Sequence, residues 1–124
     1  CLYISDGSHL TLSASRITNC EASAKTTARG GGLDVKTSTA IVNSTVIRSC
    51  RAVTSSKTRV TTGGGVALLS AAFLTITNSV VDECAADNGA GLYVLDSTAN
   101  LARRTHLRRN QGMVGSAIWI GATS

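Results

Sequence analysis

Three of the four cysteines recur at one position of a repeated pattern. Each follows an aliphatic residue by three positions, in Ile17-Thr18-Asn19-Cys20, Ile47-Arg48-Ser49-Cys50 and Val81-Asp82-Glu83-Cys84. If the fold stacks these segments, neighbouring Cα atoms fall within the range of about 4.4–6.8 Å that a disulfide accepts. Three stacked thiols can form only one bond, so a disulfide within this set and a reduced ladder of small apolar residues are both open. Cys1 lies in a different corner, and a partner for it is expected outside this chain.

Metal-binding residues do not join these cysteines. The chain has no Cys-x-x-Cys pair, and neither His9 nor His106 occupies the cysteine position of the pattern. Structural zinc sites need such ligands at short, regular spacing. The sequence therefore predicts no metal site and no cofactor.

Basic residues are concentrated in two parts of a chain whose net charge is +5. The first group comprises Lys25, Arg29, Arg51, Lys57 and Arg59, in segments that hold a single acid, Glu21. The second comprises Arg103, Arg104, Arg108 and Arg109 with His106. Such clusters favour an acidic partner, here a sulfated or uronic-acid glycan, over nucleic acid, because no aromatic residues interleave them for base stacking. A solvated surface that only improves solubility is the simpler alternative.

Acidic residues are too few and too scattered for glycosidase or lyase chemistry, which needs paired carboxylates or a calcium site. The seven acids are Asp6, Glu21, Asp34, Asp82, Glu83, Asp87 and Asp96. The adjacent pair, Asp82 and Glu83, would face opposite sides of a strand. The glycine triplets are not followed by the lysine of a phosphate-binding loop. We therefore predict no catalytic residue and no enzyme activity.

The elements that would position these residues form a repeat of variable length. A glycine-rich step precedes an apolar triplet, and the first apolar residues are Leu2, Leu33, Val66, Leu92 and Ile118, at intervals of 31, 33, 26 and 26 residues. The closing position holds Cys20, Cys50, Cys84 and then Asn110. From the residue before the first apolar position to this closing residue the spacing is 19, 18, 19 and 19. All length variation therefore lies in one connection between the units.

Within each unit the apolar residues alternate with polar ones, as in Leu10-Thr11-Leu12 and Leu74-Thr75-Ile76. Period-two patterns predict short strands, and strands this short are stable only when each pairs with its equivalent one repeat away. The sequence thus predicts an all-β solenoid with three parallel sheets and about four and a half coils of 26–33 residues, approximately residues 1–31, 32–64, 65–90, 91–116 and part of a coil at 117–124. The absence of proline agrees with strands that are paired on both edges. Gly31, Gly32, Gly64, Gly65 and Gly91 are predicted to form crowded or left-handed coil corners.

These motifs resemble the repeats of polymorphic outer membrane proteins, in which GGA followed by Ile, Leu or Val alternates with FxxN. The steps that resemble the first motif are Gly30-Gly31-Gly32-Leu33, Gly63-Gly64-Gly65-Val66, Gly89-Ala90-Gly91-Leu92 and Gly115-Ser116-Ala117-Ile118. The closing motifs resemble the second, with an aliphatic residue for Phe and Cys for Asn in three of four, as in surface proteins of algae and protists. The resemblance implies a right-handed parallel β-helix in a secreted or surface-displayed stalk, adhesin or fibre.

The expected function is therefore that of a non-enzymatic structural protein outside the cell or on its surface. The alternatives are a glycan-binding module of a larger surface protein and, less favoured, a β-helix polysaccharide lyase or glycosidase. The pattern starts and stops within a coil, so further repeats or other copies of the chain, stacked head to tail, are the expected partners. No apolar run could span a membrane. Asn43-Ser44-Thr45 is an N-glycosylation sequon, relevant in a secreting eukaryote.

Overall fold

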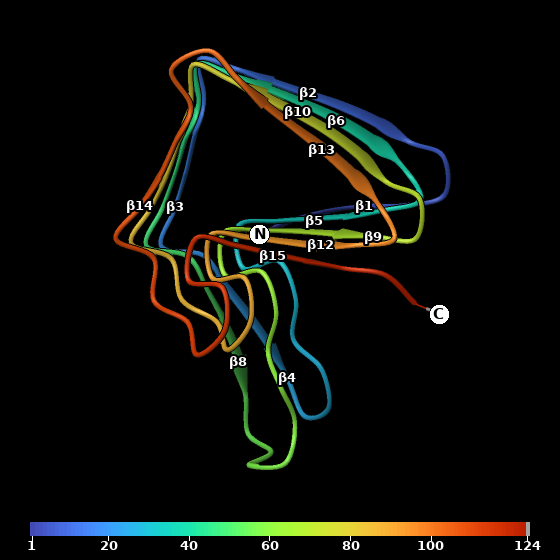
Figure 1. Ribbon diagram of the computed structural model, residues 1–124, viewed down its shortest axis with the longest axis vertical. Helices are drawn as coiled ribbons and strands as arrows, with labels where there is room; N and C mark the ends of the chain where they lie inside the picture. The colour runs from blue at the N-terminus through green and yellow to red at the C-terminus, as the bar shows by residue number, and fades with distance from the viewer. Residues whose placement is uncertain (124) are drawn as a thin grey trace.

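A computed structural model describes residues 1–123 as a coil of parallel strands with a triangular cross-section (Figure 1). Sheet A contains β1 (Leu2–Ile4), β5 (Leu33–Lys36), β9 (Val66–Leu69), β12 (Leu92–Leu95) and β15 (Ile118–Gly121). Sheet B contains β2 (His9–Ser13), β6 (Thr39–Asn43), β10 (Phe73–Thr77) and β13 (Thr98–Ala102). Sheet C contains β3 (Arg16–Thr18), β7 (Val46–Arg48), β11 (Val80–Asp82) and β14 (His106–Arg108). The predicted all-β parallel solenoid of about four turns is confirmed, with no helix among the described residues.

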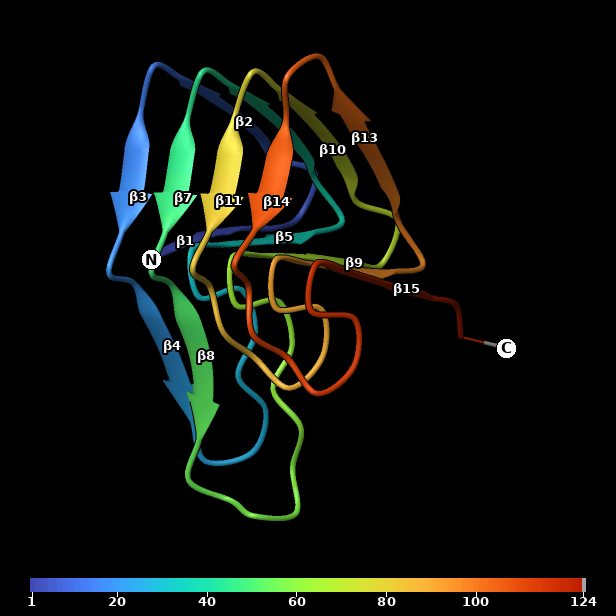
Figure 2. The same ribbon diagram turned by 60° about the vertical axis from the view of Figure 1, so that its left-hand side comes forward.

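Each strand pairs in register with the equivalent strand of the neighbouring coil. In sheet A, Leu2 lies beside Leu33 and Leu92 beside Ile118. In sheet B, Leu74 lies beside Ala40 and Ala99. Figure 2 shows the strands of sheet C side by side along the coil axis. Equivalent side chains therefore form columns that run along the axis.

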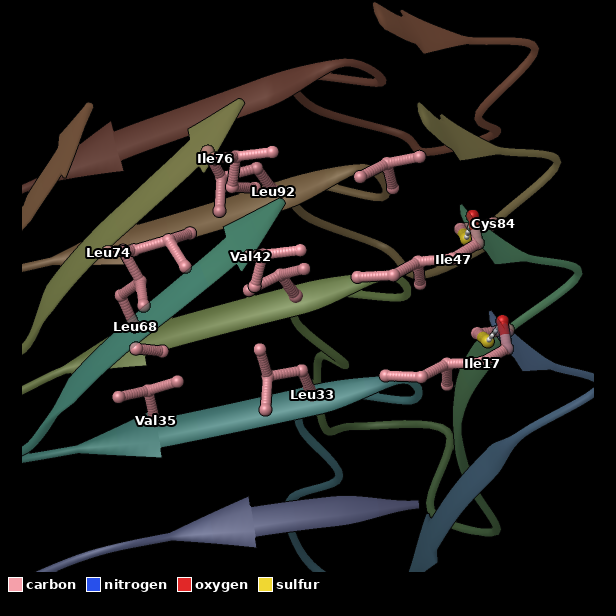
Figure 3. Packing of buried hydrophobic residues seen from close by; sticks show 14 of the residues in the cluster. Ile17, Leu33, Val35, Val42, Ile47, Leu68, Leu74, Ile76, Cys84 and Leu92 are labelled. Atoms are coloured by element: carbon pink, nitrogen blue, oxygen red, sulfur yellow. Dashed lines mark hydrogen bonds between the residues drawn. The ribbon is translucent and has the colours of Figure 1, made fainter. Parts of the chain in front are cut away.

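Inward-facing aliphatic side chains fill the triangle (Figure 3). Leu33 and Val35 from sheet A, Val42 from sheet B and Ile47 from sheet C are all at most 1% exposed. The space between three sheets is narrow, so columns of Leu, Ile and Val fill it without large rings. This packing explains why aromatic residues make up only 3% of the chain.

Single left-handed residues turn the chain at the corners, and most of them are not glycine. Ser44 (φ 50°) joins sheets B and C, and Ser49 (φ 53°) follows sheet C. Both keep their hydrogen bonds to the next coil, from Ser44 N to Thr77 O at 3.1 Å and from Ser49 N to Asp82 O at 3.0 Å. The sequence expectation concerned only the glycines before the first strand of each coil, and these other corners use non-glycine residues. The chain tolerates the cost of the left-handed conformation, about 1–2 kcal/mol per residue, because each corner continues the ladder.

The glycine steps hold both left-handed and crowded positions, and the predicted corner glycines are all of the crowded kind. Gly63 has a left-handed backbone (φ 63°), whereas Gly65 is needed because its surroundings are crowded. A Cβ on Gly65 would lie 2.5 Å from Val81 Cγ1 and 2.7 Å from Gly91 O. A Cβ at any of the other predicted positions would also meet atoms of the neighbouring coil within 3.0 Å; these are Gly31, Gly32, Gly64 and Gly91.

A fourth sheet lies outside the triangle, where the sequence predicted only loops. Sheet D consists of β4 (Glu21–Ala24) and β8 (Arg51–Thr54), which continue outward from the end of sheet C (Figures 1 and 2). They form because the first two connections are long enough to pair with each other. The next two connections are shorter, and within residues 1–123 their backbone pairs with β8 only at the isolated bridge between Arg51 and Ala85.

Candidate functional site

The closing residues of the four coils form one column at the corner after sheet C. Cys20, Cys50 and Cys84 are 6%, 0% and 0% exposed. The Cys50 thiol donates to Arg48 O at 3.3 Å, and the Cys84 thiol donates to Asp82 O at 3.4 Å. The column therefore binds backbone carbonyl groups at the corner.

The disulfide joins Cys20 to Cys1 and not to another member of the column. The S–S distance is 2.04 Å and the Cα atoms are 5.4 Å apart, whereas Cys50 and Cys84 are free. The expectation that Cys1 pairs outside this chain is therefore wrong. Cys1 occupies the position that holds a glycine in the next three coils. In the first of these coils the glycine is Gly32, and a Cβ placed on it would lie 3.3 Å from Cys50 Sγ. A cysteine in the glycine position thus faces the closing cysteine of its own coil. Alignment of the repeats places Cys1 in the glycine position, but it does not show that the two positions face each other.

Asn110 takes the place of cysteine in the fourth coil. Its Oδ1 accepts a hydrogen bond from Cys84 N at 2.9 Å, and its Nδ2 donates to Val81 O at 3.2 Å. The side-chain amide of Asn110 therefore both accepts a hydrogen bond from the backbone of the preceding coil and donates one to it. Cysteine and asparagine occupy the same position because each can donate to a carbonyl at the corner.

Hydrogen bonding between the two free thiols affects their acidity in opposite directions. The contact with Cys84 lowers the pKa of Cys50 to about 7, although burial opposes this effect. The same contact, together with burial, raises the pKa of Cys84. Because both side chains are buried, the column is a structural feature and not an exposed nucleophile.

A groove runs beside sheet D, on the side of the shorter connections. It consists of two adjoining pockets of about 440 and 320 Å³ that share Ala52, Val53, Thr61 and Asp87. We call it the connection groove. Asp87 Oδ2 accepts hydrogen bonds from Thr61 N at 2.8 Å and Thr61 Oγ1 at 3.0 Å, which link the connections of two coils.

One edge of β8 faces this groove. Ala52 N donates to Ala85 O at 3.0 Å, but the following coil turns away after this point. Backbone groups alternate sides along a strand, so the N–H and C=O groups of Thr54 face the same side as those of Ala52. Within residues 1–123 no backbone group of the shorter connections bonds to Thr54.

The structure brings together only three of the five basic residues predicted to contact a glycan. Arg51, Lys57 and Arg59 line the connection groove. Arg51 also pairs with Glu21, with Nε 2.7 Å from Oε2. The other two, Lys25 and Arg29, do not line the groove.

Lys25 and Arg29 are separated from the connection groove by their places in the coil. Lys25 follows β4, and its carbonyl accepts a hydrogen bond from Thr54 Oγ1 at 3.5 Å, on the opposite side of β8. Arg29 has its Nε 3.8 Å from Asp34 Oδ2 on sheet A. Burial raises the pKa of Asp34, and the charge of Arg29 only partly offsets this effect. The predicted five-residue basic site is therefore divided.

Only Arg108 and Arg109 of the second basic cluster pair with acids among the described residues, and Arg48 of β7 joins them around Asp82 and Glu83. Asp82, whose side chain is only 2% exposed, accepts hydrogen bonds from Arg109 Nε at 2.8 Å and Nη2 at 2.5 Å. Arg48 donates to Glu83 Oε2 from Nε at 3.0 Å and to Oε1 from Nη2 at 3.1 Å. The Arg109 hydrogen bonds lower the pKa of Asp82, with smaller contributions from the charges of Arg108 and Arg48. The sequence singled out Arg108 and Arg109 but not Arg48, and it did not indicate these pairs, because the partners come from different coils.

The sequon lies at the corner between sheets B and C. Asn43 is half-buried, and its Oδ1 accepts hydrogen bonds from Thr77 Oγ1 at 2.9 Å and Asn78 Nδ2 at 3.3 Å. Thr45 is buried and donates to Asn43 O at 3.0 Å. Glycosylation of Asn43 stays a prediction.

The described part of the chain has neither a cluster of metal ligands nor a membrane-spanning helix. Residues 1–123 contain no group of three or more His, Cys, Asp or Glu side chains that could hold a metal ion. No helix within them is long and apolar enough to cross a bilayer.

Stacked coils, in-register columns and extensible connections define a parallel β-solenoid. Comparison with known families gives the same class: residues 1–124 match the family described as "Right handed beta helix region". The chain belongs to this right-handed β-helix family. Comparisons with curated proteins and with solved structures give no match.

Proposed function

We propose that this chain is a structural segment of a stalk, surface fibre or filament outside the cell, built by stacking of β-helix coils. The observation that carries the proposal is the unbroken register of three sheets along the axis. Such columns extend without limit when another coil is added, because each coil contacts only its neighbours. The coil adds length and stiffness and, in this proposal, no catalysis.

Exposed apolar residues at the two ends of the solenoid support further stacking. Ile120 of β15 continues the inward column of Val94 but is 73% exposed. Leu2 of β1 continues the column of Leu33 and is 36% exposed. Another coil, from a longer chain or from a second copy, would cover both residues and pair with the open strand edges.

Two features support the finer assignment to a Cys-containing variant of the polymorphic outer membrane protein-type repeat. The glycine steps and closing Cys or Asn residues occupy equivalent corners in successive coils. The disulfide between Cys1 and Cys20 suits an oxidising compartment, which agrees with a secreted or surface location.

Sedimentation of the 124-residue chain over a range of concentrations tests stacking. We expect concentration-dependent association, and the Ile120→Lys variant should weaken it by placing a charge on the end face. Ile41→Lys, on the outer face of sheet B in an interior coil, is the matched control and should associate as the wild type does. A wild-type chain that stays a stable monomer at high concentration would contradict stacking between copies.

A glycan-binding module is the second candidate, and the connection groove supports it. Arg51, Lys57 and Arg59 supply positive charge, and the free backbone groups of Thr54 can bond to hydroxyl groups. A uronic-acid polysaccharide has both carboxylates and hydroxyls, so it suits these groups.

Chromatography on immobilised polygalacturonate tests this second candidate. We expect retention that the double variant Lys57→Gln/Arg59→Gln reduces, while Arg104→Gln, outside the groove, retains it. Wild-type elution at or below about 0.1 M salt would indicate only weak, screened attraction and would defeat the glycan proposal.

A further inference from the structure

A small pocket lies on the outer face of sheet C, away from the connection groove. Its volume is about 210 Å³, and it spans strands from all four coils. Val46 and Val80 contribute apolar surface, Arg16, Arg48 and Arg108 supply three guanidinium groups, and Thr18 and Asp82 complete the lining. The register explains this arrangement, because the valines are short and the neighbouring arginines are long.

The charges around this pocket do not balance. Asp82 is bonded through both oxygens by Arg109, and Glu83 is bonded through both oxygens by Arg48. These two acids are therefore matched by two arginines. Arg108 shares Asp82 with Arg109 through a longer ion pair, whereas Arg16 has no acid partner among the described residues.

Arg108 lies near an acid and Arg16 does not, but the guanidinium group of neither donates a hydrogen bond within residues 1–123. Arg108 Nε lies 3.5 Å from Asp82 Oδ1, and no hydrogen bond of its side chain occurs within residues 1–123. Arg16 forms neither an ion pair nor a side-chain hydrogen bond in the described part of the chain. Both therefore keep their donors for a ligand. The two surplus positive charges therefore lie beside the apolar surface of Val46 and Val80.

We propose that this pocket binds a phosphate or sulfate ester of a small polyol or sugar. Guanidinium groups bind such oxyanions through pairs of parallel hydrogen bonds. Arg16 and Arg108, from the first and the last full coil, can approach a tetrahedral oxyanion from opposite sides, whereas a planar carboxylate offers only two oxygens. The carbon skeleton of the ester would then contact Val46 and Val80. This site uses neither Leu2 nor Ile120 of the end faces and none of the residues that line the connection groove.

A titration followed by the arginine side-chain Nε–Hε signals in NMR tests the pocket. The probes are glucose 6-phosphate, glucose 6-sulfate and glucuronate, at equal ionic strength because salt screens such contacts. We expect either ester to shift the signals of Arg16 and Arg108, with at least about tenfold tighter binding than glucuronate. The stronger of the two esters identifies which oxyanion the site favours.

Variants separate this pocket from general attraction to a basic protein. Arg16→Gln and Arg108→Gln should each weaken ester binding about tenfold, the loss of one charged hydrogen-bonding group. Lys57→Gln and Arg104→Gln remove one charge outside the pocket and should bind as the wild type does. All four changes are at exposed positions, and unchanged circular dichroism would confirm folding. Equal binding of glucuronate, equal losses in all four variants, or no shift of either arginine would overturn the proposal.

Discussion

The closing residue of each coil shows how a single side chain connects two turns of the chain. Cysteine and asparagine both reach backbone groups at the corner after sheet C, as Cys84 and Asn110 do. Opposite them stands a glycine that leaves room for this side chain, except in the first coil, where Cys1 replaces it. The corner therefore depends on a matched pair of residues.

Replacing Gly65 by alanine tests how tightly this corner is packed. The new Cβ would meet Val81 Cγ1, which belongs to a buried side chain, and Gly91 O, which accepts a hydrogen bond from Val66 N at 3.0 Å. We expect the free energy of unfolding to fall by about 3 kcal/mol, as for severe overpacking. Urea denaturation followed by circular dichroism measures it.

Gly7→Ala is the matched control for this substitution. Gly7 has a left-handed backbone (φ 78°), but nothing lies within 4 Å of a Cβ placed there. Its loss should be limited to the conformational cost of about 1–2 kcal/mol. A Gly65→Ala variant as stable as Gly7→Ala would show that the corner relaxes easily.

Alkylation of the unfolded chain tests the cysteine pairing. Without reduction, two cysteines should react, Cys50 and Cys84, because the other two are joined. After reduction all four should react. Intact mass gives the count, and the Cys1→Ser variant should raise the non-reduced count to three. A cross-linked peptide containing Cys20 and Cys50 would instead support a bond within the column.

At the scale of single residues, the sequence predicted which side chains share a column but not which residues they bond to. The spacing of Cys20, Cys50 and Cys84 was sufficient to align them. The bond to Cys1 depends on the width of the coil between two corners, which spacing along the chain does not report. The pairing of Asp82 with Arg109 likewise depends on side chains that cross between coils.

Strands in the interior and at the end of the same sheet differ in how they tolerate proline. Outward-facing residues of sheet B donate their N–H groups to the preceding coil, as Phe73 N does to Ser38 O at 2.9 Å. Because N–H groups alternate along a strand, Thr75 of β10 donates in the same direction. Thr11 occupies the equivalent position of β2, where no strand precedes it among the described residues.

The variants Thr75→Pro and Thr11→Pro therefore form a matched pair. Thr75→Pro removes a ladder hydrogen bond between two coils and should destabilise the fold by about 3 kcal/mol or more. Thr11→Pro removes no ladder hydrogen bond and should cost much less. Urea midpoints of the two variants give the comparison. Equal losses would show that ladder hydrogen bonds do not decide where proline fits.

At the scale of elements, the period-two pattern located the strands of sheets A, B and C. Sheet D was missed because β4 and β8 carry a weak alternation, with Ala, Ser and Thr in place of large aliphatic residues. Their pairing depends on the similar lengths of two neighbouring connections. The connection groove arises from the shorter connections that follow, so its shape could not be read from either segment alone.

The whole molecule is built from interchangeable coils, and deletion of one complete coil tests this. Residues 66–91 are one repeat interval, so removing them joins Gly65 directly to Leu92 and places β12 where β9 was. We expect a folded but less stable chain, because stability in stacked repeats is a sum over units and their interfaces.

Removal of residues 66–78 alone is the control, since it shifts every following strand to the wrong sheet. This shorter deletion should abolish the cooperative thermal transition in circular dichroism, whereas removal of the full coil should retain it at a lower midpoint. Loss of folding in both would show that the third coil is essential to the structure.

The uniform stacking also determines how the chain would respond to mechanical force. Stretching it from its ends would peel coils away one after another, because each strand is bonded only to its neighbours in the stack. Each coil would release one repeat interval of 26 to 33 residues as free length. The first coil would lengthen less, because the covalent link from Cys1 to Cys20 bypasses the 19-residue separation between them. Tension entering at that end would pass through the disulfide directly to the column of closing residues.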